Sequence, residues 1–123
     1  MKQPVLNVGQ CGFDSQSIES MLQTQFGVEV VHVSTIEQSL TELRENRYAL
    51  VLVNRILDAT GEAGVDLISR ISADPDINTT PVMLVSNYEQ AQADAIEQGA
   101  VPGFGKSKLN ASETTDLLRQ YLN

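Results

Sequence analysis

Residues 48–54 read Tyr-Ala-Leu-Val-Leu-Val-Asn, an apolar run that ends on one polar amide. Short runs rich in Val and Leu are typical of strands that are buried on both faces of a sheet. The run therefore predicts a strand over 48–53, with Asn54 at its carboxyl end. An amide carries no nucleophilic oxygen anion, so Asn54 cannot form an acyl phosphate as a carboxylate can.

Four more apolar runs flank this strand, and segments with helical spacing separate them. The predicted strands cover residues 5–8, 28–33, 48–53, 81–86 and 101–105. Five helices are predicted between and after these strands. The first ends at Gly27, the second follows residue 34, and the third carries apolar residues over 65–71. The fourth spans about 89–98, and the fifth includes the apolar residues of 117–122. Strands and helices that alternate in this way indicate a parallel sheet covered on both faces. We predict a flavodoxin-like, doubly wound α/β fold with five helices and five parallel strands in the order 2-1-3-4-5.

One helix start is predicted in detail. The segment Ser34-Thr-Ile-Glu37 has the form of a capping box, in which a hydroxyl and a carboxylate each accept a hydrogen bond from a free backbone N–H. The second helix is therefore predicted to be capped by Ser34 and Glu37.

The size and charge of the chain limit the classes of function. Its 123 residues suit one domain spanning 1–123, and no apolar stretch reaches the roughly 20 residues that cross a bilayer. The first residues lack the apolar core of a signal peptide, so a cytoplasmic protein without membrane contact is expected. The net charge is −8 and basic runs are absent, so nucleic acid is not an expected partner.

Polar residues and glycines follow the predicted strands at one edge of the sheet. The carboxyl ends of parallel strands meet at the same edge, where open α/β sheets bind their ligands. Residues 9–14, Asn54, Ser86 and Lys106 are therefore expected to lie together there.

With these positions assigned, the chain resembles the receiver domain of two-component response regulators along essentially its whole length. The resemblance lies in segments that occur in the same order as in the family: the strand before Asn54, Gly64 at the start of the third helix, Thr80-Pro-Val-Met-Leu-Val-Ser86, Ile96-Glu-Gln-Gly-Ala100, and Lys106. In that family two acids after the first strand hold Mg²⁺, and an Asp after the third strand accepts phosphate. A Ser or Thr after the fourth strand binds the phosphoryl group, and a Lys after the fifth neutralises it.

The resemblance implies that the reactive acids are missing here. Gly9 and Gln10 stand at the positions of the acidic pair, and Asn54 stands at the position of the phosphate acceptor. Only Ser86 and Lys106 match the family pattern.

Two further positions depart from the family. Gly103 occupies the position of the aromatic switch residue, and Ser107 replaces the Pro that usually follows the Lys. The chain is therefore similar to an atypical, or pseudo, receiver domain.

The ammonium of Lys106 lacks its usual phosphoryl partner and needs a counter-charge. Asp14 and Asp58 are the candidate partners by loop position. The same two acids offer an alternative, in which they rebuild a cation site in the crevice.

The leading interpretation is a signalling module that is not an enzyme, needs no metal or cofactor, and acts through protein–protein contacts. By the resemblance, its interaction surface comprises the fourth helix, fifth strand and fifth helix, where a homodimer could form. Two alternatives stay open. One is a phospho-receiver that uses Asp58, and the other is a flavodoxin-like domain that binds a small ligand at residues 9–14.

Overall fold

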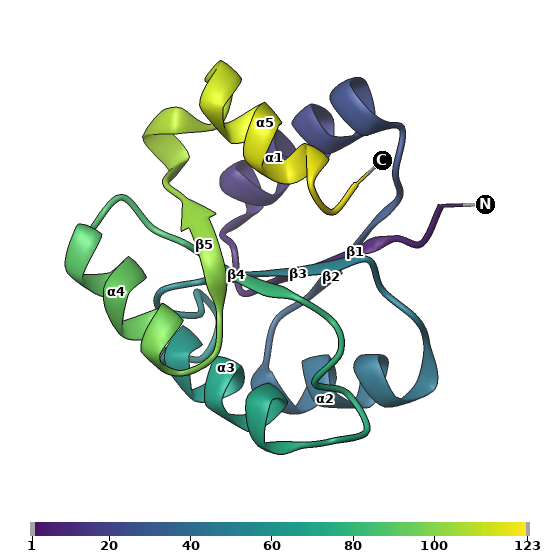
Figure 1. The fold of residues 1–123 in the computed structure, drawn as a ribbon, viewed down its shortest axis with the longest axis vertical. Helices are drawn as coiled ribbons and strands as arrows, with labels where there is room; N and C mark the ends of the chain where they lie inside the picture. Colours follow the sequence, from purple (N-terminus) through teal and green to yellow (C-terminus); the bar gives the residue numbers. More distant parts are fainter. Residues whose placement is uncertain (1, 123) are drawn as a thin grey trace.

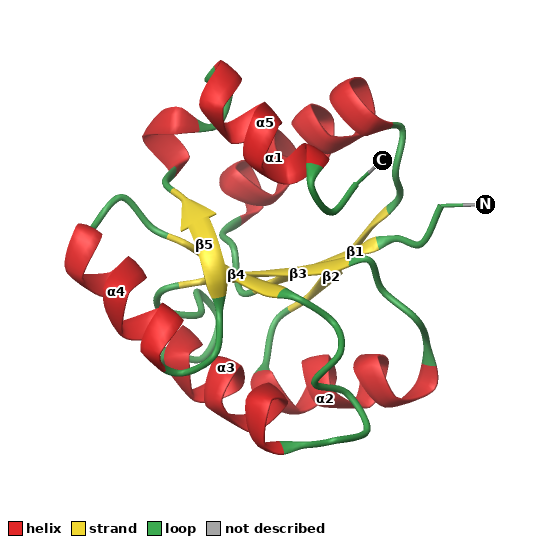
Figure 2. Cartoon of the chain, in the orientation of Figure 1, coloured by secondary structure: helices red, strands yellow, loops and turns green. Residues whose placement is uncertain are grey.

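The computed structural model describes residues 2–122. Within them, five parallel strands form one sheet in the order β2-β1-β3-β4-β5 and five α-helices cover its faces, which confirms the predicted flavodoxin-like fold (Figures 1 and 2). The strands are β1 Val5–Val8, β2 Val30–Val33, β3 Leu50–Asn54, β4 Val82–Val85 and β5 Val101–Phe104. The helices are α1 Gly12–Phe26, α2 Ile36–Glu45, α3 Gly64–Ala73, α4 Glu89–Glu97 and α5 Ser112–Arg119, and a short 3₁₀ helix, η1 Lys106–Lys108, precedes α5.

The sheet lies between two helical layers. Helices α1 and α5 cover one face, and α2, α3 and α4 cover the other (Figure 1). Strand β3 contributes Leu50 and Leu52 to the core under α1 and α5, and Val51 and Val53 to the core on the other face. Because both faces are covered, apolar residues occupy every position of the strand until Asn54. No helix within residues 2–122 has the length and apolar character needed to span a membrane.

Several element boundaries differ from the predicted ones. Strand β4 spans Val82–Val85 rather than 81–86, and β5 ends at Phe104 rather than residue 105. Helix α5 ends at Arg119, before the last apolar residues of 117–122. Strand β2 begins at Val30 rather than residue 28, and β3 begins at Leu50 and includes Asn54. Helix α1 begins at Gly12, so Asp14 lies in its first turn rather than in the preceding loop. Apolar runs extend past the hydrogen-bonded part of a strand, which is why sequence alone sets these ends poorly.

The predicted capping box at Ser34 and Glu37 is wrong by one residue. Thr35 is the N-cap of α2, and its Oγ1 accepts a hydrogen bond from Gln38 N at 3.0 Å. The Gln38 side chain in turn accepts a hydrogen bond from Ser34 N at 2.8 Å. Glu37 instead forms an ion pair with Arg70 of α3. The sequence offers two alignments of the same motif, Ser34 with Glu37 and Thr35 with Gln38, and α2 begins in the second.

Candidate functional site

The carboxyl edge of the sheet holds a crevice of about 270 Å³. The residues that line it follow β3, β4 and β5: Asn54, Arg55, Ile56, Val85, Ser86, Asn87, Tyr88 and Lys106. Of the residues expected to lie together at this edge, Asn54, Ser86 and Lys106 all line this one crevice, whereas residues 9–14 do not line it.

Asn54 ties two loops together through its side-chain amide. Its Nδ2 donates hydrogen bonds to Ile56 O at 2.9 Å and to Gly9 O at 3.3 Å. Gly9 O also accepts a hydrogen bond from the backbone N–H of Asp58 at 2.9 Å. A carboxylate could donate neither of the two side-chain bonds. The end of β3 is thus built around an amide that uses both its N–H groups on backbone carbonyls.

Lys106 forms an ion pair with Asp14. The Lys106 Nζ lies 2.7 Å from Asp14 Oδ2, which joins η1 to the first turn of α1. The hydrogen bond from Lys106 holds the pKa of Asp14 below its usual value, although partial burial of the carboxyl acts in the opposite direction. Of the two expected partners, Asp14 is therefore the one that supplies the counter-charge. Asp58 is exposed and forms no ion pair within residues 2–122.

Neither position of the expected acidic pair carries a charge. Gly9 has a φ of 73°, and a Cβ atom there would lie 2.9 Å from Leu57 Cα, so the backbone leaves no room for an acidic side chain. The side-chain amide of Gln10 is buried, and neither of its polar atoms has a hydrogen-bond partner in the described chain. Mg²⁺ in proteins is usually anchored by one or two carboxylates. With Asp14 bonded to Lys106 and Asp58 exposed, the geometry does not favour the alternative cation site.

Gln92 of α4 is a site residue that sequence reasoning did not single out. Its Nε2 donates to Leu84 O at 2.9 Å and to Ser86 O at 3.1 Å, and its Oε1 accepts from Gly103 N at 3.2 Å. The amide thus bridges β4 and β5 where their register shifts. A Cβ atom at Gly103 would overlap Leu84 O, so the position of the family's aromatic residue has no space for a side chain. Glycine in an edge strand is a signal of such close approach.

The remaining polar groups of the crevice also have internal partners. Asn87 Oδ1 accepts hydrogen bonds from Ser107 N at 3.1 Å and Ser107 Oγ at 3.0 Å. Ser86 Oγ accepts one from Tyr88 N at 3.2 Å. The guanidinium of Arg55 lies over the Tyr88 ring, 5.1 Å from its centroid. The polar side chains of the crevice are therefore largely engaged with one another or with the backbone.

Comparison with known proteins shows which solved structures share this fold. No protein-family model and no curated protein matches the chain. A solved structure of a candidate response regulator from Chloroflexus aurantiacus J-10-fl superimposes with a TM-score of 0.87 at 20% identity, covering 99% of this chain and 98% of that one. The signal receiver domain of a DNA-binding response regulator from Colwellia psychrerythraea 34H gives 0.81 at 16% identity, with 97% of each chain covered.

A response regulator receiver protein from Pseudomonas putida is similar over 98% of both chains, with a TM-score of 0.79 and 19% identity. The chain therefore has the fold of response regulator receiver domains over nearly its whole length.

Proposed function

We propose that this chain is a pseudo-receiver domain of two-component signalling, which acts through protein–protein contacts and not through phosphorylation. The observation that carries the proposal is Asn54, whose amide donates to Gly9 O and Ile56 O where a receiver has its phosphate acceptor. The domain works in the cytoplasm as a binding module, not as an enzyme, and needs no metal or cofactor. Its net charge of −8 argues against nucleic acid as a partner.

The chemistry of phosphoryl transfer supports this proposal. Transfer to a carboxylate requires a nucleophile, a divalent cation that neutralises the phosphoryl oxygens, and groups that position them. Asn54 supplies no nucleophile, Gly9 and Gln10 supply no acid, and Lys106 is already paired with Asp14 at 2.7 Å. Of the receiver machinery, Ser86 and Lys106 alone keep the expected side-chain types.

Intact-mass spectrometry after incubation with acetyl phosphate and Mg²⁺ tests this proposal. The wild-type chain should gain no phosphoryl group. An adduct that Asp58→Asn abolishes would overturn the proposal and establish the alternative phospho-receiver that uses Asp58. The matched control is Asp76→Asn, because Asp76 is an exposed acid at the opposite edge of the sheet.

The variants Asn54→Asp and Gln10→Asp/Asn54→Asp test whether the missing acids act separately. The single variant regains a nucleophile but not the acid that anchors the cation, so it should stay unlabelled. The double variant regains one acid of the pair and should be labelled faster. Equal labelling of the two variants would show that the loss at position 10 does not disable the site by itself.

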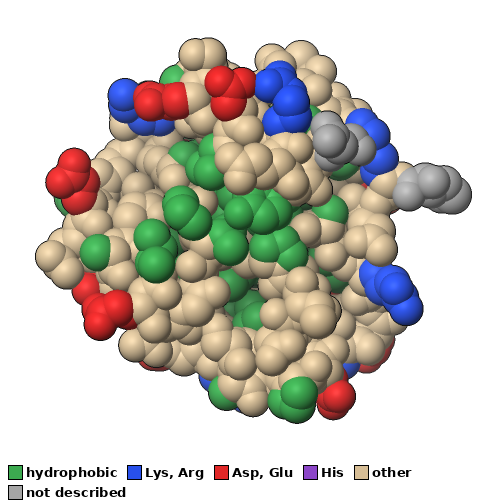
Figure 3. All heavy atoms as spheres, in the orientation of Figure 1, with side chains coloured by type: hydrophobic (Ala, Val, Ile, Leu, Met, Phe, Trp, Pro, Cys, Tyr) green, Lys and Arg blue, Asp and Glu red, His purple; other side chains and the backbone are tan. Residues whose placement is uncertain are grey.

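The proposed interaction surface comprises α4, β5 and α5. In Figure 3, hydrophobic side chains gather near the centre of the face that carries β5, and charged side chains lie towards its rim. The surface includes the exposed side chain of Ile96 and a groove of about 430 Å³ whose lining includes Gly103, Phe104 and Leu117. An apolar centre with a polar rim is typical of protein interfaces. A second copy of the chain is the proposed partner.

Sedimentation velocity on wild type and on Ile96→Lys tests the homodimer. The wild type should show a concentration-dependent dimer, and the variant should stay monomeric because a charge is placed within the proposed contact. Phe13→Lys is the matched control, since Phe13 is an exposed apolar residue on α1. A monomeric wild type would exclude the homodimer and leave a different protein as the partner.

A further inference from the structure

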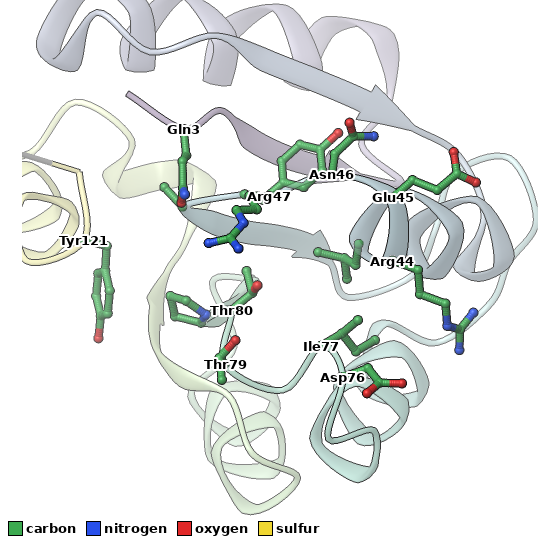
Figure 4. A pocket seen from close by; sticks show the side chains of 14 residues that line it. Gln3, Arg44, Glu45, Asn46, Arg47, Asp76, Ile77, Thr79, Thr80 and Tyr121 are labelled. Carbon is green, nitrogen blue, oxygen red and sulfur yellow. The ribbon is translucent and has the colours of Figure 1, made fainter. Parts of the chain in front are cut away.

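A second pocket lies at the amino edge of the sheet, opposite the crevice. Its volume is about 660 Å³, against about 270 Å³ for the crevice. Four segments line it: Gln3 before β1, the α2–β3 loop, the α3–β4 loop and Tyr121 after α5 (Figure 4). Pockets of roughly 300–1,000 Å³ are the usual size for small-molecule sites.

Arg47 distinguishes this pocket from other polar surface. The chain has eight Lys and Arg residues, and seven of them have a partner within residues 2–122. Five pair with acids, Lys2 donates to Phe26 O, and Arg55 lies over Tyr88. Arg47 forms no ion pair or side-chain hydrogen bond with any described residue, although acids outnumber bases two to one. Its guanidinium projects into the pocket between Gln3 and Thr80 (Figure 4).

Further hydrogen-bond donors surround Arg47. The side chains of Gln3, Thr79, Thr80 and Tyr121 line the same pocket. None of these four forms a side-chain hydrogen bond within the described part of the chain. The donors belong to separate segments and approach the pocket from several sides (Figure 4). One guanidinium fork is enough to bind a planar carboxylate, whereas donors from several directions suit the divergent oxygens of a phosphate.

We propose that this pocket binds a small organic phosphate, with the phosphate on Arg47 and the organic part against Tyr121. The lining contains two Arg residues, of which Arg44 is already paired with Asp74, so Arg47 is the cation that remains available to an anion. The volume exceeds what a bare phosphate needs, and the aromatic ring of Tyr121 offers a flat face for a base or ring. This site shares no residue with the crevice, so the proposal is independent of the pseudo-receiver function.

Titrations followed by NMR of backbone amides in the full chain test the proposal, with AMP as the probe at constant ionic strength. Saturable shifts should appear at residues 46–49 and 77–80 and at Gln3. Arg47→Gln should weaken AMP binding at least about tenfold, because the charge-assisted bonds to the phosphate are lost. Arg70→Gln is the matched control and should leave the affinity unchanged, because Arg70 pairs with Glu37 and lines neither this pocket nor the crevice. Equal effects of the two variants, shifts centred on Lys106, or no saturation by about 10 mM AMP would each overturn the proposal.

Two further probes separate the parts of the ligand. Adenosine should bind at least about tenfold more weakly than AMP, and adenosine of equal affinity would overturn the role assigned to Arg47. Inorganic phosphate should also bind more weakly than AMP. Equal affinity of phosphate and AMP would overturn the contact between the organic part and Tyr121.

Discussion

The two edges of the sheet differ in how many of their polar side chains are bonded within the fold. At the carboxyl edge, Asn54, Lys106 and Gln92 all have partners within the fold. At the amino edge, Arg47 and the hydroxyls of Thr79 and Thr80 have none among residues 2–122. Receiver domains carry out their chemistry at the carboxyl edge. In this chain, that edge is the one where more of the named polar side chains are bonded within the fold.

The carboxyl edge illustrates how a fold satisfies the polar side chains that follow its strands. A lysine or amide left without its charged partner is costly to bury unless another group of the fold bonds to it. Asp14 takes that place for Lys106, and the carbonyls of Gly9 and Ile56 take it for Asn54. The amino edge is more exposed to water, so its donors can remain free for a ligand. Substitutions at the carboxyl edge should therefore cost stability, whereas those at the amino edge should affect binding.

The largest effect is expected for Gly9→Ala. The positive φ and the contact of the new Cβ with the backbone of Leu57 should together destabilise the fold by about 3 kcal/mol. Gly12→Ala is the control, because a Cβ atom at Gly12 meets no atom within 4 Å, and it should change stability by less than about 0.5 kcal/mol. Urea denaturation measures both values. A tolerated Gly9→Ala would mean that an acid at this position is excluded for a reason other than space.

Gln92→Ala should come next, with a loss of about 2 kcal/mol, because the carbonyls of Leu84 and Ser86 and the N–H of Gly103 lose a partner. Gln90→Ala is the matched control on the same helix. Gln90 bonds only to Asp94 on the exposed face, so its loss should cost less than about 0.5 kcal/mol. Amide hydrogen exchange should also become faster at the β4–β5 junction in the Gln92 variant. Equal losses for the two variants would contradict the bridging role of Gln92.

Lys106→Met should cost about 1 kcal/mol at pH 7, since its ion pair with Asp14 is partly exposed to solvent. The pKa of Asp14 in the folded chain lies below its ordinary value of 3.8, so the pair stabilises the fold fully above that pH. The stabilisation is lost as the pH falls through the lowered pKa. The difference between wild type and variant should therefore shrink below about pH 4 and vanish in stronger acid.

The control for this pair is Lys108→Met, which removes a more exposed ion pair with Glu113 and should cost less than about 0.5 kcal/mol. Thermal unfolding from pH 2 to 7 measures both variants. A Lys106 effect that does not depend on pH would show that packing, and not the charge of Asp14, accounts for the loss.

The smallest effect on stability is expected for Arg47→Gln, within about 0.5 kcal/mol of wild type, because no described residue loses a partner. Arg44→Gln serves as the comparison, since it breaks the ion pair with Asp74 at 3.2 Å. Urea denaturation at low salt measures the two variants. A loss of more than about 1 kcal/mol for Arg47→Gln would mean that this side chain has a structural partner and that the two edges are alike.

The fold and the place of the crevice could be predicted from the amino-acid sequence. The apolar run of 48–53 and the four runs around it define the strands, because the covered faces of a parallel sheet favour apolar residues at most positions. The absence of a carboxylate at position 54 is also a property of the sequence alone. These features depend on local composition and on the spacing of apolar residues, which can be recognised without knowing which distant segments are in contact.

Which polar groups meet could be learned only from the packed molecule. Packing selects Asp14 over Asp58 as the partner of Lys106, places Gln92 between β4 and β5, and leaves Arg47 without a partner in the described chain. It also leaves no room for a side chain at Gly9 and Gly103. These outcomes depend on distances of a few ångströms between segments far apart in the sequence, and such distances are set by packing rather than by composition.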